Sequence, residues 1–226
     1  ADGPTDGQHR DDLGSTMTQP LTIAVPKGRI LDELKPLFRH AGIDLSPLTD
    51  GSRRLISVTE DGTRLILLRT SDVPTYVEYG VADVGICGLD TLLESDADVL
   101  HPVDLGLGAC RLSAAAHRSL GSDVLAKRSI KVATKYPKQA RAYFRARGSE
   151  PIIVKLYGSV ELAAVAGLAD VIVDLVSTGA TLQANDLEEL ETIRTITSRL
   201  IVNRASLMTH NKRMRALINA LTEEKG

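Results

Sequence analysis

The sequence is poor in the residues that several classes of protein need. Tryptophan is absent, and aromatic residues make up 3% of the 226 residues. The aromatic platforms on which single-stranded nucleic acids stack are therefore poorly supplied. The formal net charge is −2, so no overall positive field draws nucleic acid or an anionic membrane to the chain. We expect neither of these as a partner, and any anionic ligand must be held by local groups.

Cysteines and long apolar runs are scarce as well. The two cysteines, Cys87 and Cys110, do not have the spacing of a metal site, and so few thiols are typical of a reducing compartment. Cys110 is expected to be a buried structural thiol, because no catalytic-cysteine pattern surrounds it. No apolar run approaches the roughly 20 residues of a membrane span. Residues 1–20 are polar and lack the apolar core of a signal peptide, which predicts a disordered leader and a cytoplasmic protein.

What the sequence does contain is a regular alternation of strand and helix patterns. Its 43% of hydrophobic residues suffice for one large domain or two small ones. Apolar strand patterns at 21–25 and 130–134 are each followed by an amphipathic helix pattern, at 31–42 and 136–148. This alternation predicts an α/β fold with largely parallel sheets.

One layout occurs twice along the chain. Residues 71–88 and 158–176 each contain a short helix pattern, then Gly-x-Ala-Asp-Val, then an apolar strand. A Gly-Ala-Asp connector between a helix and a strand is common enough for coincidence to explain the match. The alternative is two similar lobes that face each other across a cleft, with the chain crossing between them near Ala109.

A small, hydroxyl-rich loop follows the second of these strands. It consists of Ser177, Thr178, Gly179, Ala180 and Thr181. Ligands of open α/β sheets bind beyond the carboxyl ends of the strands, and Gly179 permits a positive φ and close backbone approach. Successive N–H groups, hydroxyls and the start of a helix near Thr181 would together favour an anion. Ser, Thr and Gly also form ordinary capped turns, so this pattern alone leaves a phosphate site and a plain turn equally open.

Two carboxylates and a cationic loop are further candidates. Asp174 lies near the end of the same strand, where a carboxylate suits sugar hydroxyls or a metal ion. Glu161 lies in the first turn of a predicted helix, a position that helix-dipole complementarity also explains. Lys27 and Arg29 flank Gly28 directly after the first strand pattern. Two cations there suit a polyanionic ligand, although they are equally compatible with solvated loop charges.

Five separate motifs, in this order, resemble ATP phosphoribosyltransferase, the first enzyme of histidine biosynthesis. They are IAVPKGRILDE, LLRTSDVPTYVEYGVADVGICGLD, KVATKYPKQARAYF, IVKLYGSVELA and DVIVDLVSTGATLQANDL. The resemblance runs from about Leu21 to about Leu221. The end of the chain soon afterwards is similar to the short form of this family, which lacks a C-terminal regulatory domain.

The resemblance implies a fold and a reaction. The fold is two α/β lobes similar to type II periplasmic binding proteins, with a cleft between them. Lobe I would comprise residues 21–108 and about 195–226, and lobe II residues 109–194. The reaction is attack of N1 of ATP on C1 of phosphoribosyl pyrophosphate (PRPP), giving phosphoribosyl-ATP and pyrophosphate, with Mg²⁺ as cofactor. The implied partners are a second catalytic subunit, in a homodimer, and a regulatory subunit that resembles histidyl-tRNA synthetase.

The resemblance also assigns roles to residues. PRPP would be bound by Glu161, Asp174, Ser177, Thr178, Gly179, Ala180 and Thr181. ATP would be bound by Lys27, Gly28, Arg69 and Asp90. Arg29 and Arg53 would stabilise the charge that develops on the leaving pyrophosphate, and Asp174 and Glu161 would hold the metal. No general base is required, because N1 of adenine has no proton to remove.

Two other functions remain open from the residues alone. One is a two-lobed small-molecule binding module without catalytic activity. The other is a nucleobase-salvage phosphoribosyltransferase, which would also use PRPP but should have a single-lobed plan. A phosphate loop paired with a cationic loop favours an ATP phosphoribosyltransferase over a binder of neutral solutes, which would need neither loop.

Overall fold

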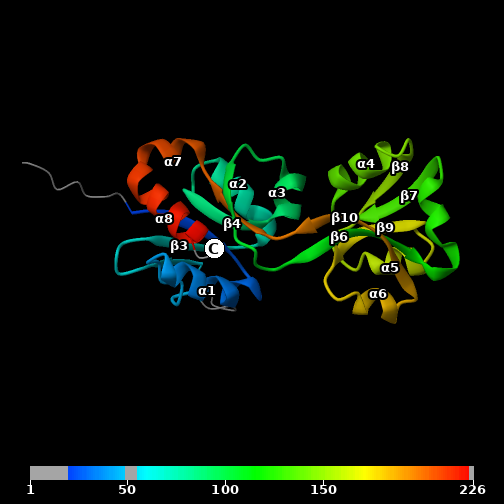
Figure 1. The fold of residues 1–226 in the computed structure, drawn as a ribbon, viewed down its shortest axis with the longest axis horizontal. Helices are drawn as coiled ribbons and strands as arrows, with labels where there is room; N and C mark the ends of the chain where they lie inside the picture. The colour runs from blue at the N-terminus through cyan, green and yellow to red at the C-terminus, as the bar shows by residue number, and fades with distance from the viewer. Residues whose placement is uncertain (1–19, 49–54, 224–226) are drawn as a thin grey trace, which may run out of the picture.

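The protein has two lobes that lie side by side, each built on one β-sheet (Figure 1). The structure is a computed structural model that describes residues 20–48 and 55–223. The first lobe contains β1 (Thr22–Pro26), α1 (Ile30–His40), β2 (Ile56–Val58), β3 (Arg64–Leu68), α2 (Val73–Glu78), β4 (Val84–Gly88), α3 (Leu89–Ser95), β5 (Leu100–Asp104), β11 (Ser198–Val202), α7 (Arg204–Thr209) and α8 (Asn211–Glu223). The second lobe contains β6 (Cys110–His117), β7 (Ser129–Thr134), α4 (Pro137–Arg145), β8 (Glu150–Lys155), α5 (Glu161–Val165), β9 (Val171–Val176), α6 (Ala180–Ala184) and β10 (Leu187–Ile196).

The chain crosses between the lobes after β5 and returns between β10 and β11 (Figure 1). The strand order is β2-β3-β1-β4-β11-β5 in the first sheet and β10-β6-β9-β7-β8 in the second. The predicted two-lobed α/β fold is therefore confirmed, whereas the predicted boundaries of the lobes at 108/109 and about 194/195 stay predictions. The predicted leader, apart from Pro20, and Arg53 lie outside the described residues.

The expectation of largely parallel sheets is wrong, because both sheets are mixed. β1 is parallel to β3 and β4, and β7 is parallel to β8 and β9. β2, β5, β6, β10 and β11 pair antiparallel with their neighbours. Four of them flank the two places where the chain passes from one sheet to the other: β5 and β6 at the first, and β10 and β11 at the second. The helix-and-strand alternation describes the parallel half of each lobe and carries no information about the crossings.

The layout that occurs twice in the sequence is a shared topology. β1, α1, β3, α2 and β4 form a β-α-β-α-β unit, with β2 inserted before β3, in which the first strand lies between the other two. β7, α4, β8, α5 and β9 form the same unit in the second lobe. After α2 and after α5 the chain turns through a glycine in the left-handed region, with φ of +70° at Gly80 and +73° at Gly167. Such glycines end helices without steric cost.

The aspartates of the two Gly-x-Ala-Asp-Val stretches have equivalent backbone partners. Thr22 N donates to Asp83 Oδ2 at 2.7 Å, and Asp83 N donates to Thr22 O at 2.8 Å. Lys131 N donates to Asp170 Oδ2 at 2.9 Å, and Asp170 N donates to Lys131 O at 2.9 Å. Each aspartate thus ties the start of the third strand of its unit to the first strand. This reciprocal pair explains why both copies need Asp at this position.

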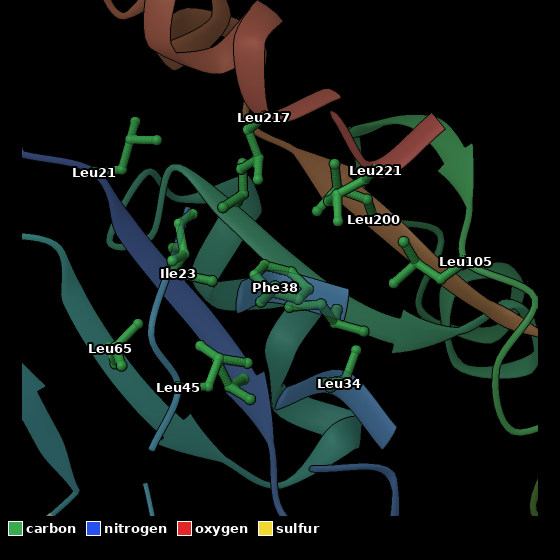
Figure 2. Packing of buried hydrophobic residues seen from close by; sticks show 14 of the residues in the cluster. Leu21, Ile23, Leu34, Phe38, Leu45, Leu65, Leu105, Leu200, Leu217 and Leu221 are labelled. Carbon is green, nitrogen blue, oxygen red and sulfur yellow. The ribbon is translucent and has the colours of Figure 1, made fainter. Parts of the chain in front are cut away.

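The core of the first lobe fixes the helices against the sheet (Figure 2). Leu31, Leu34 and Phe38 lie at helical spacing on α1 and are buried against the strands. Leu217 and Leu221 of α8 pack into the same cluster. Because burial of such side chains is the main source of stability, the sheet edge that carries the loops after β1 and β4 is held rigidly.

Candidate active site

A small cavity at the carboxyl end of β9 gathers one set of predicted residues. Its volume is about 160 Å³, and its lining comes from β6, α5, β9 and the loop into α6. All of the residues predicted to bind PRPP line it: Glu161, Asp174, Ser177, Thr178, Gly179, Ala180 and Thr181. Residues separated by up to 20 positions therefore meet in one place, as an open α/β sheet predicts for the ends of its strands.

The loop itself, residues 177–181, has the backbone geometry that its sequence predicts. Gly179 has φ +82° and ψ 0°, and α6 begins at the next residue. A Cβ at Gly179 would find ordinary contact distances, so glycine is required for its backbone conformation. Thr178 Oγ1 accepts a hydrogen bond from Ala180 N at 3.3 Å. The first N–H groups of a helix lack carbonyl partners within it, so this loop offers donors to an anion.

Two carboxylates border this loop. Asp174 is half-buried, and its hydrogen bond within the described residues comes from Leu175 N at 2.9 Å. Burial raises the pKa of Asp174, and the negative charges of Glu161 and Asp90 add to this effect, whereas the hydrogen bond from Leu175 N and the positive charge of Lys135 offset part of it. Neither Asp174 nor Glu161 forms a salt bridge with a described residue. The cavity therefore presents negative charge that a hydroxyl donor or a cation would compensate.

A larger cleft lies between the two lobes and adjoins the small cavity. Its volume is about 810 Å³. The lining comes from the loops after β1, β3, β4 and β7 and from the crossings between the lobes. Leu175 and Ser177 line both the cleft and the small cavity, so the two spaces meet at the loop. Together they can hold one ligand at the loop and a second ligand beside it.

The predicted ATP and catalytic residues are distributed unevenly around this cleft. Arg29 and Asp90 line it. Lys27, Gly28 and Arg69 are not among its lining residues, although they adjoin the lining residues Pro26, Arg29 and Thr70. Lys27 N donates to Leu68 O at 2.8 Å, which continues the pairing of β1 with β3. The Lys-Gly-Arg loop therefore reaches the cleft through Arg29.

Sequence reasoning missed Tyr136, which lines the cleft from the second lobe. Tyr136 N donates to Thr134 Oγ1 at 2.8 Å, which fixes the start of the loop after β7. Burial raises the pKa of Tyr136, and the negative charge of Asp90 raises it further. Tyr136 of the second lobe therefore lies close to Asp90 of the first lobe. The signal that could have found Tyr136 is the shared topology, because it follows β7 as Lys27 and Arg29 follow β1.

The expectation that Cys110 is buried is wrong, because Cys110 is only partly buried at the edge of the cleft, whereas no catalytic role for it is indicated. Cys87 is buried, and burial raises its pKa to about 12. Cys110 is half-buried and lines the cleft; burial and the charge of Asp90 raise its pKa. Both thiols therefore stay protonated at neutral pH, and a protonated thiol is a poor nucleophile.

Contacts between α3 and α4 fix the position of one lobe on the other. Glu94 of α3 accepts hydrogen bonds from Lys138 N at 3.0 Å and Gln139 N at 3.4 Å, which are free donors at the start of α4. Gln139 Nε2 donates to Asp90 O at 2.9 Å. The start of one lobe's helix is thus capped by the other lobe's carboxylate.

Two lobes with a ligand-sized cleft between them define the class of fold. The structure is similar to the VFT2 domain of Bordetella pertussis BvgS, with a TM-score of 0.58 and 13% identity over 91% of this chain and 89% of that one. It is also similar to Tv2483 bound to L-arginine, with a TM-score of 0.57 and 16% identity over 91% of this chain and 86% of that one. At these identities the likeness establishes the fold alone.

Closer relatives establish the family. The sequence model of the family described as HisG, ATP phosphoribosyltransferase, matches residues 69–223. The ATP phosphoribosyltransferase 2 of Geobacter sulfurreducens is 50% identical over 208 residues, which cover 91% of this chain and 98% of that protein. The ATP phosphoribosyltransferase of Citrifermentans bemidjiense is 49% identical over 206 residues, which cover 90% and 97%. The ATP phosphoribosyl transferase (HisG:HisZ) complex from Thermotoga maritima matches with a TM-score of 0.77 and 32% identity over 90% of this chain and 97% of that one.

The chain belongs to the ATP phosphoribosyltransferase family. This confirms the predicted enzyme class, a pentosyl-transferring enzyme, and its catalytic role in histidine biosynthesis. A binding module without activity and a single-lobed salvage enzyme are both set aside by the same finding. The helices of the described residues include none that is long and apolar enough to cross a membrane.

Proposed function

We propose that PRPP binds in the small cavity of the second lobe and that ATP binds beside it in the cleft between the lobes. N1 of the adenine attacks C1 of the ribose, the C1–O bond to pyrophosphate breaks, and phosphoribosyl-ATP forms. The observation that carries this proposal is that all of the predicted PRPP residues line one cavity, which meets the interlobe cleft at Leu175 and Ser177.

The loop 177–181 would hold the 5-phosphate of PRPP. Its free N–H groups and the hydroxyls of Ser177, Thr178 and Thr181 supply donors without adding a fixed positive charge. Asp174 and Glu161 would accept hydrogen bonds from the ribose hydroxyls. Asp174 suits this role because it is half-buried and has few partners, so a hydroxyl donor would offset the cost of its buried charge.

Arg29 would face the leaving pyrophosphate. Ribosyl transfer passes through a state in which positive charge gathers on the ribose and negative charge on the leaving group. A cation aimed at that negative charge stabilises the transition state more than the ground state. Arg29 lines the cleft from the first lobe, opposite the phosphate loop, and its guanidinium can contact phosphate oxygens in pairs. Arg53, which lies outside the described residues, remains a second candidate.

ATP would be oriented by groups of both lobes. Asp90 lines the cleft at the start of α3, and Tyr136 meets it from the second lobe. Lys27, Gly28 and Arg69 border the same edge of the first sheet and would contact the triphosphate. The main task of these residues is orientation, since a well-placed nucleophile needs no proton transfer here.

The donors in the small cavity fit Mg²⁺ bound together with PRPP. No cluster of three or more acidic, histidine or cysteine residues suited to a metal occurs in the described part of the chain. Mg²⁺ commonly uses one or two carboxylates together with substrate oxygens, and Asp174 and Glu161 offer two carboxylates beside the proposed phosphate site. When bound, the ion would neutralise charge on the pyrophosphate. Asp174 and Glu161 would hold it and orient the ribose.

The assembly and location are proposed from the same relationships. The Thermotoga maritima relative was solved as a HisG:HisZ complex. We propose that this chain likewise joins a regulatory subunit, one that resembles histidyl-tRNA synthetase, and that two copies of the chain form a homodimer. The cytoplasm stays the predicted location.

The proposed reaction is tested with ATP, PRPP and Mg²⁺ in an absorbance assay in which pyrophosphatase removes the pyrophosphate. Phosphoribosyl-ATP, identified by its mass, is the expected product. Absence of that product at micromolar enzyme, with the regulatory subunit also supplied, would contradict the proposal. Thr178→Ala should raise the KM for PRPP about tenfold and leave the KM for ATP within about twofold, since it removes one hydroxyl donor from the phosphate loop. An equal rise for both substrates would place the phosphate elsewhere.

A further inference from the structure

The start of the phosphate loop is anchored by a residue that the sequence did not indicate. Arg111 lies on β6, directly opposite Val176 of β9. Its Nη1 donates a hydrogen bond to Ser177 O at 3.2 Å. Arg111 therefore contacts the loop where it leaves the strand, from outside the small cavity that Ser177 lines.

The guanidinium of Arg111 is held in one orientation by Glu189 of β10. Arg111 Nε donates to Glu189 Oε1 at 2.8 Å, and Nη2 donates to Oε2 at 2.6 Å, which makes a two-point contact. Glu189 is held in turn by Ser113 Oγ at 2.7 Å, from a fully buried side chain, and by Thr192 Oγ1 at 3.1 Å. Because Nε and Nη2 of Arg111 are engaged by Glu189, its Nη1 remains available and donates to Ser177 O.

The strand β10 is irregular directly after Glu189, which itself lies opposite Ala115 of β6. The register between β10 and β6 shifts between Glu189 and Glu191 and again between Thr192 and Arg194. Shifts of this kind re-aim side chains along a strand. The carboxylate of Glu189 reaches both Arg111 and Ser113, which are two residues apart on β6. Glu189 of this strand is thus linked through Arg111 to the loop.

The anchored carbonyl controls a donor on the other side of the peptide bond. No peptide bond among the described residues is cis, so the C=O of Ser177 and the N–H of Thr178 point in opposite directions. A carbonyl fixed toward Arg111 turns the N–H of Thr178 away from Arg111. That orientation is set before any ligand arrives, because the network needs no ligand to form.

We propose that Arg111 is a positioning residue for PRPP: held by Glu189, it fixes the Ser177–Thr178 peptide so that the loop N–H groups face the phosphate. This inference rests on the proposed function of the loop. The charge of the pair persists across the working pH range, because hydrogen bonds from Arg111, Ser113 and Thr192 hold the pKa of Glu189 at about 2. Arg111 acts through the loop and does not itself contact the substrate.

The substitution Arg111→Lys tests the inference. Lysine keeps the positive charge but lacks the planar fork that reaches Glu189 and Ser177 together. The KM for PRPP, and its Kd by calorimetry, should rise about tenfold, the factor that matches the loss of one hydrogen bond at a charged ligand. The KM for ATP should stay within about twofold. Glu189→Gln, which keeps the shape of the side chain, should produce the same selective loss and replaces Arg111→Lys as the test if that variant fails to fold.

A matched control lies in the same lobe. Arg145 makes the same two-point contact with Glu150, at 3.1 and 2.8 Å, on an exposed surface. Arg145→Lys should leave both KM values unchanged. A parallel rise of both KM values in Arg111→Lys would overturn the inference and make Arg111 a structural residue.

Thr178→Ala separates this inference from the proposed function. If Thr178→Ala weakens PRPP binding and Arg111→Lys does not, the loop binds phosphate and the positioning role is wrong. If neither variant affects PRPP, both the positioning role and the phosphate assignment are overturned. A selective PRPP effect in Arg111→Lys, Glu189→Gln and Thr178→Ala, with none in Arg145→Lys, supports both.

Discussion

The two lobes share a β-α-β-α-β unit, yet the helix that follows the third strand begins differently in each. In the first lobe β4 leads directly into α3, and the carboxylate of Asp90 folds back into the space that a side chain on Gly88 would need. In the second lobe β9 is followed by the loop 177–181, whose helix start has no acidic side chain. The first helix start is therefore filled by its own anion, and the second is open to an anion from outside.

The comparison separates the residues that maintain the fold from the residues that suit ligand binding. The reciprocal bonds of Asp83 and Asp170 occur in both lobes, so they belong to the fold. At the corresponding strand ends, consecutive hydroxyl residues and a glycine with positive φ occur only in the second lobe, at Ser177, Thr178 and Gly179. The first lobe has Gly88 in extended conformation and a single hydroxyl at Thr91. A shared topology gives two equivalent places, and in the proposed function a few residues at the end of one strand make that place suitable for phosphate.

The largest effect is expected when the open loop is forced out of its conformation. Gly179→Val places a β-branched residue at φ +82°, which should lower kcat/KM for PRPP about 100-fold, roughly 3 kcal/mol, because the loop cannot keep its donors in place. Gly62 has the same φ of +82° in the turn between β2 and β3. Gly62→Val should cost comparable stability, measured by thermal melting, without a selective loss for PRPP. A similar kinetic loss in both variants would make the effect of Gly179 a general one.

The shared aspartates should differ in their contribution to stability. Asp83 accepts hydrogen bonds from Thr22 N and from Ser206 Oγ at 2.6 Å, whereas Asp170 accepts from Lys131 N and from an exposed Lys127 at 3.2 Å. Asp83→Ala should lower the free energy of unfolding by about 2–3 kcal/mol, and Asp170→Ala by about 1 kcal/mol. Denaturant titration measures both values. A larger loss of unfolding free energy for Asp170→Ala than for Asp83→Ala would show that burial of the aspartate does not set its contribution to stability.

The cationic loop of the first lobe should act in the chemical step. Arg29→Ala should lower the single-turnover rate about tenfold, since Arg29 lines the cleft and a lost cation destabilises the departing pyrophosphate. Lys27→Ala should have an effect of about twofold or less on the same rate, because Lys27 does not line the cleft. Rapid-quench measurements on the two variants give the comparison. An unchanged rate in Arg29→Ala would remove it from the transition state.

The smallest effect concerns Asp174 and depends on pH. Its pKa is raised in the folded protein, so its ionisation costs stability above the raised pKa and costs nothing below its ordinary value of 3.8. Asp174→Asn should therefore raise the melting temperature of the ligand-free protein slightly at pH 7, and the gain should vanish as the pH falls toward 4. The same variant should bind PRPP less tightly. A gain that is independent of pH would mean that charge is not its cause.

The position of the loop 177–181 at the end of a strand could be predicted from the sequence, because its parts are close together, whereas its phosphate role is implied by the family resemblance and stays a prediction. Five residues of the cavity lining, 177–181, are consecutive, and they directly follow the strand that carries Asp174. Arg111 could not be predicted, because its partners Ser177 and Glu189 are distant from it in sequence. Tyr136 could be located only through the topology that the two lobes share, because its neighbour Asp90 is also distant in sequence. Such contacts depend on how two lobes or two strands meet.

The fold, like the site, has parts that local sequence patterns predict and parts that depend on distant contacts. The parallel units follow from alternating helix and strand patterns, and the buried stripe of α1 follows from its helical spacing. β5 was missed because it contains Pro102 and exposed side chains, which are features of an edge strand. The strands β6, β10 and β11 at the crossings have extended patterns in the sequence, but their antiparallel direction could not be predicted, because local patterns do not reveal the direction in which a chain returns to a sheet.

The cap that Glu94 supplies to α4 makes two backbone amides sensitive to the contact between the lobes. If the lobes separate, Lys138 and Gln139 lose their acceptor, and the amide protons at the start of α4 become free to exchange with solvent. Loss of this cap adds a cost to separation of the lobes even in the absence of substrate. Exchange with deuterium at these two positions would therefore follow separation of the lobes without a bound ligand.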